Sequence, residues 1–297
     1  MNKGILYAVG AYLAWGVLPL YWKALQDVPA LQILSHRIAW SFILLAILIT
    51  LKNTWQPIKA AIVNPRTLFI FFIATILLSV NWLTYIWGVN SGYIVETSLG
   101  YFINPLVNVL LGVFFFREKL RSTQWLSIAF AAGGVLYLTV AVGRLPWIAL
   151  TLAFTFGFYG LAKKTSTLGS LQGLTLETAI LFLPAVFFLG IAELRGESSY
   201  THINLSTDVL LVFTGVVTAL PLVLFGSAAQ KIHLSTLGLL QYLAPTLQFL
   251  IGVWIYGEPF TQATLSGFLL IWLGLLLYSA EGFLVYRKAP VTTNPAK

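Results

Sequence analysis

Residues 67–95 read TLFIFFIATILLSVNWLTYIWGVNSGYIV and contain no charged side chain. A helix needs about 20 mainly apolar residues to cross the roughly 30 Å hydrocarbon core of a bilayer, so this stretch is long enough to span a membrane. Six other charge-free runs are spread along the 297-residue chain, at 4–22, 97–116, 122–143, 145–162, 209–230 and 259–280. Because these runs recur from end to end, the sequence predicts a multi-pass membrane protein and not a soluble domain with a single anchor.

The composition excludes a soluble enzyme and a disordered protein. Hydrophobic residues make up 59% of the chain and charged residues only 9%, whereas a soluble domain devotes about a quarter of its residues to charge. The net charge of +8 does not indicate a nucleic-acid partner, because the basic residues lie singly or in small groups at the ends of apolar runs. The chain has no cysteine and its three histidines are scattered, so we expect no metal site and no cofactor.

The apolar pattern predicts an all-α integral membrane fold with ten transmembrane helices. Helices are expected because lipid offers the backbone no hydrogen-bond partner and the alternation of a barrel strand is missing. The longest connections, near 52–66 and 193–207, are too short to form a catalytic domain outside the membrane. The predicted spans are 4–22, 33–51, 67–90, 95–116, 123–142, 146–162, 172–192, 208–230, 234–256 and 262–284.

The lysine and arginine residues are distributed unevenly between the two sets of loops. If the N-terminus is cytoplasmic, 13 of the 17 basic residues fall on the cytoplasmic side and three, Lys23, Arg144 and Arg195, fall outside, with Arg37 alone inside a span. Since basic residues in short loops set the orientation of membrane proteins, the sequence predicts that both termini are cytoplasmic.

The chain contains an internal repeat. A shift of 140 residues aligns several residues without a gap, including Pro105 with Pro245, Gly112 with Gly252, Glu118 with Glu258 and Gly134 with Gly274. Five helices per half is an odd number, so the second copy must enter the membrane in the opposite orientation. The matched loops 117–121 (REKLR) and 257–261 (GEPFT) keep the acid and lose the basic residues, as the two orientations require. We therefore expect two inverted five-helix repeats, 1–142 and 146–285, followed by a cytoplasmic tail, 286–297.

Several motifs resemble one known family. The stretch 96–105 (ETSLGYFINP) leads into 117–120 (REKL), and SHR at 35–37, NW at 81–82 and YGLAKK at 159–164 accompany it. Together they resemble the RarD branch of the drug/metabolite transporter superfamily, over nearly the whole chain and as two EamA-type repeats. The resemblance implies a permease of the bacterial inner (plasma) membrane with ten helices and a central cavity formed mainly by helices 1, 3, 4, 6, 8 and 9. The family label, chloramphenicol-sensitive protein, implies a link to drug export, but superfamily relatives carry chemically diverse cargo, so the substrate stays open.

Polar and aromatic residues inside the spans are the candidates for a substrate cavity. In the fourth span Glu96, Gly100 and Asn104 recur every four residues and share one helix face. Helix packing through small residues is the alternative interpretation of such a stripe, and anchoring at the membrane interface is the alternative for aromatic residues near span ends. The cavity candidates are Trp15, Asn81, Tyr85, Tyr101, Asn104, Tyr159 and Gln241.

A second set of candidates consists of ionisable residues placed where the membrane makes charge costly. These are His36, Arg37, Glu96, Glu177 and Lys163. One interpretation is structural, with Arg37 paired to Glu96, and with Lys163 extending toward the membrane interface. The other is proton coupling through Glu96 or Glu177, since a carboxylate in a low-dielectric pocket binds a proton reversibly.

These features predict a secondary transporter whose inverted halves move about a midplane cavity and export a small organic metabolite or drug. The chain lacks a phosphate-binding loop, so the energy is expected to come from an ion gradient or from the gradient of the substrate. The alternatives are a channel or non-transporting partner protein, and an intramembrane enzyme acting on a lipid-linked substrate, although no catalytic cluster of acids or histidines supports the latter. The expected partners are the small-molecule substrate and the lipid bilayer; substrate identity, transport direction, coupling ion and oligomeric state stay open.

Overall fold

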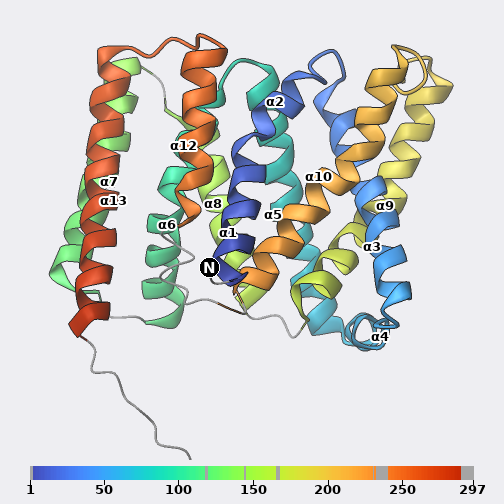
Figure 1. Ribbon diagram of the computed structural model, residues 1–297, viewed down its shortest axis with the longest axis horizontal. Coiled ribbons are helices and arrows are strands. Elements are labelled where there is room, and N and C mark those ends of the chain that lie inside the picture. The colour runs from blue at the N-terminus through green and yellow to red at the C-terminus, as the bar shows by residue number, and fades with distance from the viewer. Residues whose placement is uncertain are drawn as a thin grey trace, which may run out of the picture.

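The structure, a computed structural model, describes residues 3–117, 120–143, 145–164, 168–229, 231 and 240–288. Every regular element in this part of the chain is helical (Figure 1). The helices are α1 (Lys3–Gly16), α2 (Leu18–Lys23), α3 (Ala30–Leu51), α4 (Gln56–Val63), α5 (Pro65–Asn90), α6 (Ile94–Phe116), α7 (Ser122–Val142), α8 (Trp147–Lys164), α9 (Ser170–Leu194), α10 (Leu205–Ala229), α12 (Leu243–Leu250) with the π-helix η1 (Ile251–Ile255), and α13 (Gln262–Lys288).

Each of the ten predicted spans falls on helix in the described residues. Six helical segments are long and apolar enough to cross a membrane, while Trp147–Ala162, Leu243–Ile255 and Gln262–Tyr278 are apolar but shorter. The number of ten crossings therefore stays a prediction. The six long segments are Lys3–Lys23, Ala30–Leu51, Pro65–Asn90, Ser122–Ala141, Ser170–Leu194 and Leu205–Phe225.

The first predicted span is divided into α1 and α2 because of Pro19. Proline has no N–H to donate and its ring crowds the carbonyl four residues earlier, which here belongs to Trp15. That carbonyl instead accepts a hydrogen bond of 3.0 Å from the side chain of Gln248 in α12. The break thus provides a polar contact between the start of the chain and its last third.

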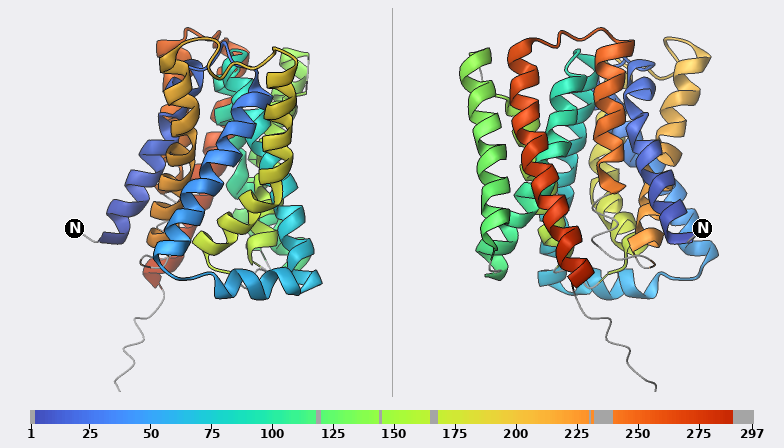
Figure 2. Two further views of the ribbon diagram at one scale, coloured as in Figure 1. Left: turned by 90° about the vertical axis from the view of Figure 1, so that its right-hand side faces the viewer. Right: turned by 60° about the vertical axis from the view of Figure 1, so that its left-hand side comes forward.

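The helices lie side by side between two faces (Figures 1 and 2). We call one the α4 face, because α4 lies across the bundle there and α13 ends there (Figure 2). We call the opposite side the loop face; it carries the connections 24–29, 91–93, 195–204 and 256–261. Helices α7 and α13 pack together at one edge of the bundle and α3 and α9 lie at the other edge, with the remaining long helices between them (Figure 1).

The helix contacts come in pairs that are related by exchanging the two halves of the chain. The 140-residue shift superposes α1, α3, α5, α6 and α7 on α8, α9, α10, α12 and α13 in order. The contact of α1 with α10 is accordingly matched by that of α8 with α5, and the contact of α6 with α8 by that of α12 with α1. Two helices pack against their own counterparts, α3 on α9 and α7 on α13.

The aligned glycines Gly134 and Gly274 occupy equivalent places in the α7–α13 contact. A Cβ at Gly134 would lie 2.8 Å from the carbonyl oxygen of Gly267, and a Cβ at Gly274 would lie 2.6 Å from that of Ser127. Small residues allow such close backbone approach, which is a main source of helix association in lipid. The two glycines therefore explain why these helices form one edge of the bundle.

Replacing Gly274 by alanine is expected to lower stability by about 1–3 kcal/mol, because the added methyl group must push α7 away from α13. The loss would be measured as a lower melting temperature of the purified protein in detergent. Gly190→Ala in α9 is the matched control, since no atom lies within 4 Å of its added Cβ. Equal melting temperatures for the two variants would contradict a tight α7–α13 contact.

Candidate functional site

Arg37 of α3 is the most unusual buried residue of the structure. Its side chain is only 4% exposed, and it lies seven residues into α3, about 10 Å below the loop face at the usual helical rise. Its Nε atom donates a 2.7 Å hydrogen bond to Oγ1 of Thr218 in α10. The guanidinium carbon lies 3.9 Å from the ring centre of Trp82 in α5 and 5.2 Å from that of Trp22 in α2.

The predicted Arg37–Glu96 ion pair is wrong. Among the described residues no carboxylate lies within 4 Å of the Arg37 guanidinium, and its Nη1 atom is buried without a hydrogen-bond partner. Glu96 instead accepts a 3.2 Å hydrogen bond from the backbone N–H of Ile148 at the start of α8. A carboxylate is favoured there because the first N–H groups of a helix lack partners within the helix. Arg37 is therefore held by a hydroxyl and two indole rings.

Asn81 joins three helices beside this arginine. Its Nδ2 atom donates to the carbonyl of Leu152 and to Oγ1 of Thr155, each at 3.0 Å, and both acceptors belong to α8. The hydroxyl of Tyr101 in α6 donates to Oδ1 of Asn81 at 3.3 Å. The Tyr101 ring also meets that of Tyr85 edge-on, with 5.6 Å between ring centres. Three cavity candidates from the sequence, Asn81, Tyr85 and Tyr101, are thus brought together.

Glu177 of α9 is 2% exposed and accepts a 3.0 Å hydrogen bond from the hydroxyl of Tyr159 in α8. Ring contacts from Tyr101 through Phe156 connect Tyr159 with the Asn81 group. Trp82 contacts Arg37 and also lines a cavity of about 10 Å³ together with Glu177. These contacts form one connected cluster, which we call the polar centre: Arg37, Asn81, Trp82, Tyr85, Tyr101, Tyr159 and Glu177.

The other sequence candidates lie outside the polar centre. Trp15 packs against Tyr12 and Phe225, and Asn104 donates to the carbonyl of Ala153 at 3.2 Å, which ties α6 to α8. Gln241 is half-buried just before α12. The His36 ring lies 5.2 Å from that of Tyr200 near the loop face. Lys163 is in the last turn of α8, and its side chain lies outside the described part of the chain.

Glu258 has a structural role that the sequence did not predict, since the sequence analysis used this residue only to align the repeats. Its two carboxylate oxygens accept hydrogen bonds of 2.7 and 2.8 Å from the backbone N–H groups of Ile94 and Val95, at the start of α6. Gly252 of η1 lies against the same two residues, at distances that leave little room for a side chain. One sequence gives no signal that an acid binds a helix start 164 residues away. Glu258 thereby fastens the end of η1 to α6 at the loop face.

A cavity of about 160 Å³ opens beside this contact and is lined by Glu96, Leu99, Glu258 and Phe268 among others. It reaches the loop face and shares no lining residue with the polar centre. The residues of the polar centre are buried, apart from the half-buried Tyr101, and the small cavity that Trp82 and Glu177 line has room for about one water molecule.

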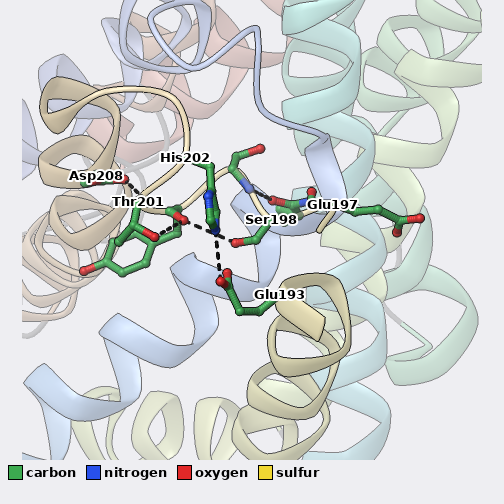
Figure 3. Close-up of polar contacts among 9 residues, drawn as sticks. Glu193, Glu197, Ser198, Thr201, His202 and Asp208 are labelled. Atoms are coloured by element: carbon green, nitrogen blue, oxygen red, sulfur yellow. Dashed lines mark hydrogen bonds and ion pairs between the residues drawn. The ribbon is translucent and has the colours of Figure 1, made fainter. Parts of the chain in front are cut away.

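The α9–α10 connection covers the loop face above α3 (Figure 3). The side chain of Gln32 in α3 donates to the carbonyl of Glu197 at 2.7 Å and accepts from the N–H of Ser199 at 2.9 Å. Nε2 of His202 in the connection lies 2.9 Å from Oε1 of Glu193 in the last turn of α9; Figure 3 marks this contact with a dashed line. This ordered loop places Tyr200 on His36, the neighbour of Arg37.

The sequence matches a family model in both halves. The model described as the EamA-like transporter family matches residues 2–140 and 145–280. The chain belongs to the EamA-like transporter family. Protein RarD from Streptomyces exfoliatus is 42% identical over 288 residues, covering 97% of this chain and 91% of the relative. An uncharacterized transporter from Vibrio cholerae is 44% identical over 283 residues, covering 95% of this chain and 93% of that relative.

This EamA-family chain is thus a RarD-type member of the drug/metabolite transporter superfamily, and it is a multi-pass membrane transporter. One solved protein structure, 18% identical, superposes with a TM-score of 0.59 over 92% of this chain and 96% of its own. At that identity the likeness shows the shared fold alone. The predicted family is thereby confirmed, and so is the prediction of an all-helical membrane fold with two EamA-type repeats. The ten crossings stay a prediction.

Proposed function

We propose that this EamA-family protein is a secondary transporter that moves a small organic molecule across the membrane by alternating access. The observation that carries this proposal is the composition of the polar centre. Arg37, Asn81, Trp82, Tyr85 and Tyr101 come from the first half of the chain, and Tyr159 and Glu177 from the second. A polar site between two repeats is where secondary transporters of inverted-repeat architecture bind their substrates.

The proposal includes ten membrane spans in two inverted repeats, 1–142 and 146–285, with the loop face outside and both termini in the cytoplasm. The exchange-related helix contacts support the repeat, and the excess of basic residues at the α4 face supports the orientation. Export is the proposed direction, and the bacterial inner membrane the proposed location.

The buried polar centre corresponds in this proposal to one state of the transport cycle. The cavity that Trp82 and Glu177 line, about 10 Å³, is too small for an organic substrate. Access therefore requires that the helices around the polar centre separate at one face while the opposite face stays closed. The Glu258 contact at the start of α6 is the closure that we assign to the loop face.

The test is transport by the purified protein in proteoliposomes. Radiolabelled amino acids, nucleobases, phenicol drugs and organic acids would be offered singly, with protein-free vesicles as the control. A carrier gives uptake that saturates with substrate and that is accelerated by the same unlabelled compound on the other side. Flux that rises linearly without such acceleration would favour a channel, and chemical conversion of a compound would favour an intramembrane enzyme.

A further inference from the structure

We propose that the substrate carries an anionic group, a carboxylate, that pairs with Arg37, and that a flat apolar body attached to it lies among the aromatic rings of the polar centre. This inference rests on the proposed function, because it assigns a substrate class to the same site. It also identifies Arg37, which lies in the second predicted span, as the residue that selects anionic substrates over neutral and cationic ones.

The first argument is the missing counter-charge. Arg37 is 4% exposed, and among the described residues its guanidinium has no carboxylate within 4 Å. A buried charge that lacks a partner destabilises a protein strongly, and charges inside membrane spans are functional by default. The two indole rings and the Thr218 hydroxyl stabilise the cation only in part. An anionic ligand would supply the charge that the described part of the chain does not provide.

The second argument is the kind of group left without a partner around the guanidinium. Nη1 of Arg37, the indole N–H of Trp22 and the hydroxyl of Tyr85 are all buried and have no hydrogen-bond partner among the described residues. Each of the three unpartnered groups is able to donate a hydrogen bond, whereas a carboxylate only accepts. An ammonium group has no acceptor, so it could donate to the Tyr85 hydroxyl but would leave Nη1 of Arg37 and the indole N–H of Trp22 unpaired.

The third argument concerns the shape of the ligand. Nε of Arg37 donates to Thr218. The outer edge of the guanidinium, formed by Nη1 and Nη2, is therefore the edge that remains for a ligand acceptor. Trp82 covers one region of the guanidinium at 3.9 Å, and Tyr85, three residues further along α5, meets Tyr101 edge-on. A carboxylate bound to the outer edge would place the rest of its molecule against these rings. Flat or apolar organic acids fit this surface, whereas strongly hydrated sugars do not.

The experiment measures ligand-induced stabilisation of the full-length protein, purified in a neutral detergent without anionic lipid. Four acids are each compared with their own amide at pH 7: benzoate, phenylacetate, nicotinate and indole-3-acetate. We expect at least one acid to raise the melting temperature more than its amide does. Arg37→Gln should weaken binding of that acid by about tenfold to a hundredfold, the range for a charge-assisted hydrogen bond, and leave amide binding unchanged.

Two further variants make the result decisive. Arg37→Lys keeps the positive charge but loses the planar donor edge, so it should bind the acid with an affinity between wild type and Arg37→Gln, even if the glutamine variant folds poorly. Arg66→Gln removes an exposed arginine at the start of α5 and should bind like wild type. The inference is overturned if no acid exceeds its amide, if Arg37→Gln binds the acid like wild type, or if only added phosphatidylglycerol stabilises the protein through Arg37.

Failure of this inference is distinguishable from failure of the proposed function. The binding assay does not require transport, so acid binding through Arg37 without any saturable flux in proteoliposomes would reject the transporter and keep the site. Saturable flux restricted to neutral or cationic compounds would keep the transporter and overturn the anionic substrate class.

Discussion

Glu258→Gln is expected to open the loop face of this EamA-family protein. The carboxylate accepts two backbone hydrogen bonds at the start of α6, where the helix dipole favours negative charge. A glutamine keeps one acceptor oxygen and loses the charge, which should cost the closed conformation about 1–2 kcal/mol. The open population should accordingly rise about five- to thirtyfold.

The chain contains no cysteine, so one introduced cysteine can report this opening without background. Leu99 is buried and lines the cavity beside Glu258. In the Leu99→Cys background, Glu258→Gln should accelerate modification by a membrane-impermeant thiol reagent by the same factor. Glu281→Gln is the matched control, because Glu281 pairs with Arg121 near the α4 face. An unchanged modification rate in Glu258→Gln would show that this carboxylate does not hold the loop face closed.

Glu177→Gln is expected to abolish substrate-driven proton movement. Glu177 is the buried carboxylate of the polar centre, and the Tyr159 hydroxyl donates to it. Burial in low dielectric allows such a group to exchange its charge for a proton, while glutamine keeps the acceptor oxygen for Tyr159 but binds no proton. Substrate transport down its own gradient should continue in the variant, uncoupled from protons.

The measurement uses a pH-sensitive dye inside proteoliposomes, with whichever compound shows saturable uptake as the driving substrate. Glu96→Gln serves as the matched control, because that carboxylate binds the start of α8 at the loop face and lies outside the polar centre. We expect its coupling to persist. Proton movement of wild-type size in Glu177→Gln would assign coupling to another group or exclude it.

Much of the fold was predictable because its signals are local. The charge-free runs and the basic residues between them depend only on neighbours along the chain, and each predicted span falls on helix in the described residues. The break at Pro19 was less clear, since a proline near a span end also occurs at a helix start. The short helix α4 was missed because eight residues in a polar connection give too little periodicity.

Most residues of the candidate site were predictable, but Trp82, which contacts Arg37, was not among the sequence candidates. Asn81, Tyr85, Tyr101, Tyr159, Arg37 and Glu177 were all selected as polar or charged residues inside apolar spans. Their partners were not, because partners come from helices far apart in sequence. Asn104 ties α6 to α8, whereas Asn81 belongs to the polar centre. This difference depends on which neighbouring helix each side chain faces in the packed bundle.

The sequence by itself determined that this chain is a helical membrane protein with a repeated half, since burial in lipid is governed by the local density of apolar and charged residues. Only the tertiary structure decided that Arg37 has no carboxylate partner in the described part of the chain and that Glu96 and Glu258 each bind the start of another helix. The physical reason is that a charged side chain in a low-dielectric interior binds the nearest hydrogen-bonding group that lacks a partner. Which group is nearest depends on helix packing across the whole chain.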